Sequence, residues 1–258
     1  MRARLFLLVL TLFVWGLAGA LFGSLFAALY GVLGVVGLSG WQPLLVGAAA
    51  AAMTTSAFYS AMPVALVGAM AGVLASIVYL MVSGAQHIDL VQIAGFAAVA
   101  GVAAGGFYAW MVKGGGRPLA ETTTGLAAGL AAGGLVWAGL VLVEHEPDML
   151  IMAAGVVALV GSLFKLSERW LVGRLAGHFP RAVSAPIVAG LIAAVVGASI
   201  WIMGGTTTAG MDLAARGAVE GVLHQVPHGF LGGMLGGAVT GVILELLGMH
   251  LEDDEHVV

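Results

Sequence analysis

The chain has no cysteine and few charged side chains among its 258 residues. Without cysteine there can be no disulfide, no iron–sulfur cluster and no thiolate metal site. Charged residues make up 9% of the sequence, against about 25% in an ordinary globular domain. The net charge is −4 and the basic footprint of a nucleic-acid-binding protein is missing, so we expect no nucleic-acid partner.

Motifs that carry catalysis are missing as well. The sequence contains no phosphate loop, no HExxH zinc motif, no dinucleotide fingerprint and no Ser-His-Asp spacing. No histidine, carboxylate or lysine falls at the middle of an apolar run, which argues against an intramembrane haem and against a proton pump. We therefore predict that the protein is not an enzyme.

Apolar residues form 61% of the chain and recur in long runs. Runs of 18 or more apolar residues are typical of transmembrane helices, whereas barrel strands are shorter and alternate. We predict an all-α polytopic membrane protein with eight transmembrane helices. The expected spans are 5–36, 42–61, 63–83, 89–112, 121–143, 149–166, 184–204 and 227–248. The N-terminus resembles a secretory signal, but its apolar run continues to Gly37, so we expect an uncleaved first helix.

The distribution of lysine and arginine predicts the orientation. With the N-terminus inside, Arg216 is the one basic residue among nine that falls outside. We predict a protein of the bacterial inner membrane with both termini, including the acidic tail 249–258, in the cytoplasm. The inner linker 165–183 mixes basic residues with Trp170 and Leu171, which is typical of a short amphipathic helix near anionic headgroups. Docking of a soluble partner is the alternative.

Glycine accounts for 41 residues and often recurs every four positions. Small residues at this spacing let helix backbones approach closely, so we expect tight packing within the chain. Contact with other subunits of a homo-oligomer, contact with other membrane subunits and a pore-lining face are the alternatives. The glycines concerned are Gly19, Gly23, Gly31, Gly125, Gly129, Gly133, Gly229, Gly233, Gly237 and Gly241.

Two pairs of segments resemble each other and suggest an inverted repeat. Residues 42–51 resemble 185–194, and residues 63–73 resemble 227–237. Members of each pair run in opposite directions in the predicted topology, as in many transporters. The second copy carries an amphipathic outer insertion at residues 205–226.

A stripe of polar side chains follows the four-residue spacing of one helical face around this insertion. Its members are Asp212, Arg216, Glu220, His224 and His228. Glu220, His224 and His228 suit a divalent transition metal such as zinc, nickel or cobalt. Pro227 weakens this reading, because it is expected to end a helix before His228. A solvated interfacial stripe and a pH-sensitive histidine gate are the alternatives.

Further polar residues are predicted at the outer surface and within the second span. Glu144, His145, Glu146, Asp148 and Asp212 are expected to form an acidic outer mouth, although outer loops poor in lysine and arginine look acidic in any case. Thr54, Thr55, Ser56 and Tyr59 form the most polar patch within a span and are the candidate lining of a pathway.

These features together predict a transport protein or channel for a small solute or ion, with a divalent metal cation captured at the outer face. The first alternative is a non-catalytic membrane subunit that scaffolds a larger inner-membrane complex. The second is an enzyme that acts on lipid at the outer interface, for which no nucleophile can be nominated.

Overall fold

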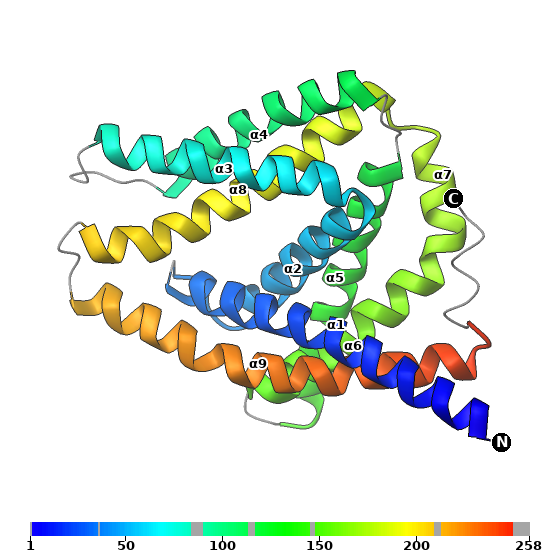
Figure 1. Ribbon diagram of the computed structural model, residues 1–258. Helices are drawn as coiled ribbons and strands as arrows, with labels where there is room; N and C mark the ends of the chain where they lie inside the picture. The colour runs from blue at the N-terminus through cyan, green and yellow to red at the C-terminus, as the bar shows by residue number, and fades with distance from the viewer. Residues whose placement is uncertain are drawn as a thin grey trace. The chain divides into compact units, whose positions relative to one another are not determined.

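The structure is a computed structural model that describes residues 2–35, 37–83, 90–112, 117–144, 148–208 and 213–249. Every regular element in these ranges is helical (Figure 1). The elements are α1 (Arg2–Val35), α2 (Gln42–Ser60), α3 (Met62–Ser83), α4 (Leu90–Val112), α5 (Arg117–Leu142), α6 (Met149–Ser167), the π-helix η1 (Glu168–Val172), α7 (Gly173–Ala176), α8 (Arg181–Thr208) and α9 (Leu213–Leu246).

Seven of the described helices are long and apolar enough to cross a membrane. The prediction of a helical membrane protein is therefore confirmed at this level. Helix α2 is not among the seven, and it carries Gln42 and several hydroxyl side chains, which lower its mean hydropathy. The count of eight spans stays a prediction.

The expected breaks between helices have clear local causes. Gly37 and Gly40 turn the chain between α1 and α2 with φ angles of 99° and 64°, which L side chains rarely adopt. Pro63 lies in the first turn of α3, where its missing N–H leaves no helical hydrogen bond unmade. The break between α2 and α3 therefore falls where the sequence predicts it.

The last two helices are longer than predicted. α8 continues to Thr208 and α9 begins at Leu213, so the described part of the predicted insertion 205–226 belongs to these helices and forms no element of its own. Pro227 lies inside α9 and does not end it, contrary to the expectation from the sequence. With 34 residues, α9 is about 51 Å long, well beyond a hydrocarbon core of about 30 Å.

The chain divides into two compact units, and each is built from separated segments. Unit 1 comprises residues 1–52, 127–166 and 221–258, and unit 2 comprises residues 53–126 and 167–220. The boundaries fall inside α2, α5 and α9, so each of these helices contributes one part to each unit.

In unit 1, α9 packs against both α1 and α6 through glycine. A methyl carbon placed on Gly233 would lie 2.8 Å from Cα of Gly23 on α1, well inside an ordinary contact. A methyl placed on Gly236 would lie 2.9 Å from Cβ of Val157 on α6. The Thr240 hydroxyl, 1% exposed, lies 3.1 Å from the carbonyl oxygen of Gly236 and 3.3 Å from that of Ala158. This hydroxyl joins α9 to α6 where both backbones run close together.

In unit 2, α8 packs against both α3 and α4, and these two helices also contact each other (Figure 1). A methyl carbon on Gly72 of α3 would lie 2.6 Å from the carbonyl oxygen of Ala193. A methyl on Gly101 of α4 would lie 2.6 Å from the carbonyl oxygen of Ala189. Ala189 is fully buried and belongs to the hydrophobic core of this unit. Alanine and glycine on α8 thus allow two neighbours to approach it.

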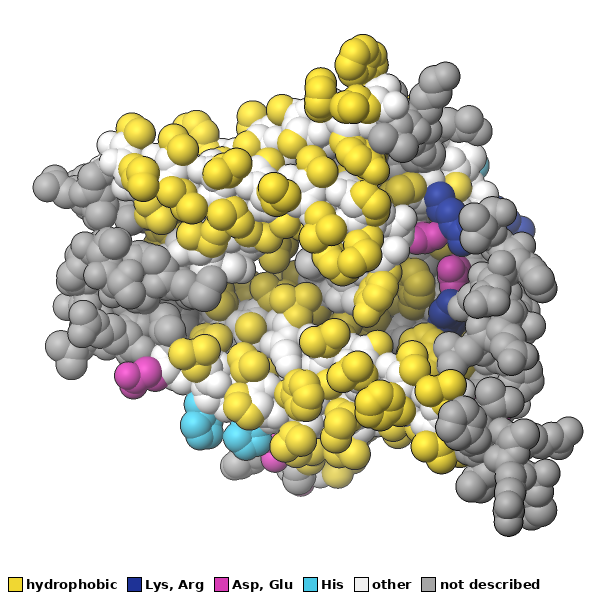
Figure 2. Space-filling model, viewed as in Figure 1, with side chains coloured by type: hydrophobic (Ala, Val, Ile, Leu, Met, Phe, Trp, Pro, Cys, Tyr) yellow, Lys and Arg dark blue, Asp and Glu magenta, His cyan; other side chains and the backbone are white. Residues whose placement is uncertain are grey.

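Large hydrophobic side chains remain on the surface of the chain, as Figure 2 shows. The most exposed include Phe13, Met81, Val91, Trp110 and Leu142. A water-soluble protein rarely exposes apolar patches on this scale. In lipid hydrocarbon such a surface avoids the unfavourable free energy of contact with water, in agreement with the apolar helices.

Candidate functional site

The predicted metal ligands lie on successive turns of α9. Glu220, His224 and His228 are all exposed, and the continuous helix keeps them at four-residue intervals through Pro227. The rings of His224 and His228 have centroids 5.5 Å apart. The break that Pro227 was expected to introduce between the two imidazoles is therefore not present.

A backbone hydrogen bond orients the His228 ring. Its Nδ1 lies 3.2 Å from the carbonyl oxygen of His224, and a carbonyl can only accept, so Nδ1 carries the proton and donates. The neutral tautomer then leaves the Nε2 lone pair available to a cation. One turn earlier, the backbone carbonyl of Leu223 loses its usual helical donor because Pro227 has no N–H.

No preformed ligand set surrounds this pair. Among the residues that the structure describes, no three histidine or carboxylate side chains lie together so that they could hold a metal ion. The pair on α9 offers two imidazoles, and Glu220 is one turn further along the same helix. A metal at Glu220, His224 and His228 therefore stays a prediction.

The predicted outer mouth is described only in part. Glu144 is exposed with a φ of 50°, and Asp148 is exposed just before α6. The Asp148 carboxylate accepts a hydrogen bond of 2.8 Å from the backbone N–H of Leu150, so it caps the start of α6. His145, Glu146 and Asp212 lie outside the described residues.

The candidate pathway residues on α2 do not share one environment. Tyr59 is 66% exposed, whereas Ser56 is buried and its hydroxyl bonds to the carbonyl of Met53 at 3.1 Å. The Thr54 hydroxyl is buried with no hydrogen-bond partner, and Thr55 is half-buried. Successive helical positions point about 100° apart, so these side chains cannot line a single wall.

Most of the glycines at four-residue spacing lie close to another helix, and their role in packing stays a prediction. Methyl carbons added to six of them would clash with the backbone of a neighbouring helix: Gly19, Gly23, Gly129, Gly229, Gly233 and Gly237. A methyl carbon on Gly31 would clash with the side chain of Val222. Methyl carbons on Gly133 and Gly241 would lie in tight contact with Leu45 and Trp15, respectively. Gly125 is buried. The contacts of the other nine glycines lie within unit 1. They leave little room for a pore along the α1–α9 contact.

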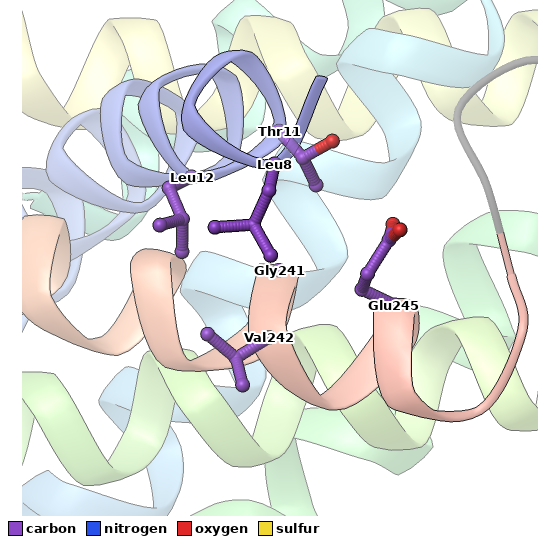
Figure 3. A pocket seen from close by; sticks show the side chains of 6 residues that line it. All are labelled: Leu8, Thr11, Leu12, Gly241, Val242 and Glu245. Atoms are coloured by element: carbon purple, nitrogen blue, oxygen red, sulfur yellow. The ribbon is translucent and has the colours of Figure 1, made fainter. Parts of the chain in front are cut away.

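A small pocket opens between the start of α1 and the end of α9 (Figure 3). Its lining consists of Leu8, Thr11, Leu12, Gly241, Val242 and Glu245. The free volume is about 10 Å³, which holds about one water molecule. The pocket is too small to hold a solute larger than water.

Unit 2 brings together polar residues that the sequence does not link. The Ser184 hydroxyl at the start of α8 accepts a hydrogen bond of 3.0 Å from the backbone N–H of Leu119, in the first turn of α5. The guanidinium of Arg117 lies 2.6 Å from Glu121 and 3.8 Å from Glu168. The pair of Arg117 with Glu121 is local to one helical turn, whereas the contacts of Leu119 with Ser184 and of Arg117 with Glu168 join residues far apart in the chain and have no local signal.

Comparisons with protein-family models, with curated proteins and with solved structures find no match to this chain. The class that the fold defines is a membrane-embedded helical protein, which rests on the seven apolar helices.

Proposed function

We propose that this protein carries a small solute or ion across its membrane, as a transporter or channel, and that its cargo is a divalent transition-metal cation. We also propose that it lies in the bacterial inner membrane with both termini in the cytoplasm. The observation that carries the transport proposal is a duplicated packing pattern within the two units.

The duplication begins with the contact between the central helix of each unit and one neighbour. In unit 2, Ala189, Ala193 and Gly197 of α8 meet Gly68, Gly72 and Ser76 of α3 in turn. In unit 1, Gly232, Gly236 and Thr240 of α9 meet Leu150, Ala154 and Ala158 of α6. The residues on α9 lie 43 positions after those on α8, and the residues on α6 lie 82 positions after those on α3.

The other neighbour of each central helix follows the same register. Gly190 of α8 faces the backbone of Ala98 and Val102 on α4. Gly233 of α9, which lies 43 positions after Gly190, faces Gly19 and Gly23 on α1. Ala98 and Val102 lie 79 positions after Gly19 and Gly23, respectively.

The set α1, α6 and α9 therefore repeats the set α4, α3 and α8. In chain order, α4 is the third helix after α1, and α6 is the third helix after α3. An odd number of crossings reverses direction through the membrane, which is the arrangement of an inverted repeat, common among secondary transporters.

This register differs from the one inferred from the sequence. The sequence pairs residues 42–51 with 185–194, whereas the packing pairs 185–197 with 228–240. Chance similarity between glycine- and alanine-rich stretches accounts for the difference, because many alignments of such stretches score alike. The packing contacts are more selective, since each depends on which residue meets which neighbour.

The His224–His228 pair supports a cationic cargo. Borderline divalent ions prefer imidazole nitrogen, and two imidazoles at adjacent turns of one helix form a chelating pair. Both rings are exposed, and the ring of His228 is oriented by its backbone hydrogen bond. Glu220 would add a carboxylate on the next turn of the helix.

Flux into liposomes tests the proposal. Purified protein in vesicles loaded with a metal-sensitive dye should admit Zn²⁺, Co²⁺ or Ni²⁺ faster than vesicles without protein. The double variant His224→Ala with His228→Ala should raise the half-saturating concentration, because it removes both nitrogen ligands. His178→Ala is the matched control, since this exposed imidazole lies after α7.

Three results would count against parts of the proposal. Absence of flux for all three ions would reject the cation as cargo. Absence of flux together with stoichiometric co-purification of other membrane proteins would favour the scaffolding role. Equal flux in the double variant and the wild type would retain transport and reject the histidines as the capture site.

A further inference from the structure

Four elements of unit 2, α4, α5, α8 and η1, are linked in turn along one edge, and α7 follows η1 directly in the chain. The end of α4 reaches the start of α8, since a methyl carbon on Gly105 would lie 3.1 Å from Cα of Pro186. The hydrogen bond between Leu119 and Ser184 joins α5 to α8, and the ion pair of Arg117 with Glu168 adds η1. We call the side chains on α5, η1 and α7 the basic edge and define it by Arg117, Glu168, Trp170 and Arg174.

The basic edge has one guanidinium that is not matched by a carboxylate. Arg117 lies within ion-pair distance of both Glu121 and Glu168, so its charge is already matched by carboxylates. Within the part of the chain that the structure describes, Arg174 has no carboxylate at ion-pair distance. Its guanidinium lies 5.8 Å from the centroid of the Trp170 ring, in a cation–π arrangement. This pair is exposed, so its charge is open to a ligand.

Connectivity places this pair at a membrane boundary. The candidate spans Met149–Ser167 and Val183–Trp201 flank the linker that contains η1 and α7. Trp170 is 56% exposed, and Trp110 at the end of α4 is 78% exposed. Tryptophan prefers the level of lipid headgroups, where its ring is partly apolar and its N–H is solvated.

The backbone of the linker presents Trp170 and Arg174 outward. Val172, between them in the sequence, is 4% exposed and anchors the linker to the protein. Nδ1 of His178 lies 2.7 Å from the carbonyl oxygen of Arg174, which fixes the turn that follows α7. The π-helix widens the turn before this point, and such bulges are frequent at functional sites.

We propose that Trp170 and Arg174 bind the phosphate of an anionic lipid headgroup. The planar guanidinium offers several donors in the geometry that phosphate oxygens accept, and the indole ring packs against the headgroup and upper acyl region. Exposed apolar side chains elsewhere in the same unit, such as Phe107 and Trp110 of α4, favour lipid as the occupant. The proposal is independent of any transport activity.

Lipid retention measures this binding directly. The full chain is placed in nanodiscs of equal parts phosphatidylglycerol and phosphatidylcholine, released into mild detergent and examined by native mass spectrometry. The wild type should retain phosphatidylglycerol in preference to phosphatidylcholine. Arg174→Gln should lower this preference about fivefold, the effect of one basic residue near an anionic membrane surface. Adding Trp170→Leu should lower it further.

Two further variants make the result specific. Arg174→Lys should retain part of the preference, because lysine keeps the charge and loses the planar donor geometry. Arg216→Gln removes the same charge from another part of the chain and should leave the preference unchanged. Arg174 is exposed, so its substitution should leave the melting temperature in detergent unchanged.

Each outcome of these measurements either supports or overturns the proposed lipid site. An unchanged preference in Arg174→Gln would overturn the proposal, and so would an equal loss in Arg216→Gln. Displacement of the bound lipid by glycerol phosphate at equal concentration would overturn it as well, because the site would then recognise the soluble anion. Selective loss in the Arg174 variants alone supports the lipid site.

Discussion

Replacement of Gly233 by alanine tests the contact between α1 and α9. The added methyl carbon would lie 2.8 Å from Cα of Gly23 and 3.0 Å from the carbonyl carbon of Gly19. Ordinary van der Waals contact begins at 3.4 Å, and both obstacles are backbone atoms that cannot rotate away. The two helices must therefore separate by at least about half an ångström to admit one methyl group.

The expected magnitude follows from the cost of overpacking. Extra methylene groups in a well-packed interior cost about 1–3 kcal/mol, and the loss falls at the upper end when backbone has to move. Alanine recovers about 1 kcal/mol of helix propensity over glycine. We expect a net fall of about 1–2 kcal/mol in the free energy of unfolding.

Unfolding in mixed micelles by titration with sodium dodecyl sulfate, followed by tryptophan fluorescence, measures the change. Gly139→Ala in α5 is the matched control, because a methyl carbon there would meet nothing within 4 Å. This variant should be as stable as the wild type or slightly more stable. Equal gains in stability from Gly233→Ala and Gly139→Ala would refute the close approach of α1 and α9.

Three further predictions follow from described contacts and from the predicted topology. Ser76→Ala should raise the free energy of unfolding by about 1 kcal/mol in the same titration, because the buried hydroxyl has no hydrogen-bond partner; a fall would mean that it has one. Ser184→Ala should lower it by about 1 kcal/mol, since the N–H of Leu119 loses its acceptor; no change would reject this cap. Asp212→Cys should react with an impermeant maleimide in intact cells, and Asp254→Cys only after permeabilisation; labelling of both from one side would reject the predicted topology.

The helices could be predicted from the sequence because the bilayer imposes a simple requirement on composition. Runs of apolar residues long enough to span hydrocarbon are visible without any tertiary information. Gly37, Gly40 and Pro63 mark breaks for local reasons of backbone conformation. The last predicted span begins at residue 227, inside α9, whose first residue is Leu213, because the prediction places a boundary at Pro227. A proline inside a long helix costs hydrogen bonding, which packing along the rest of the helix can offset.

The candidate site could be predicted only where it depends on one helix. The spacing of His224 and His228 brings their rings together because both lie on α9. The pair formed by Trp170 and Arg174 is also local, and the sequence indicated its amphipathic linker. The link between Leu119 and Ser184 depends on which helices become neighbours, and glycine-rich helices carry little side-chain information on that choice.

The segmentation of unit 1 has a consequence for how the protein is made. Its first segment ends at residue 52, and its last segment begins at residue 221. When α1 leaves the ribosome, the glycine face that α9 will cover has no partner, and most of the chain must be synthesised before that partner arrives. Until then lipid or an insertion factor has to occupy this face. A nascent chain that stops before α9 should therefore leave unit 1 incomplete, however well its earlier helices have entered the bilayer.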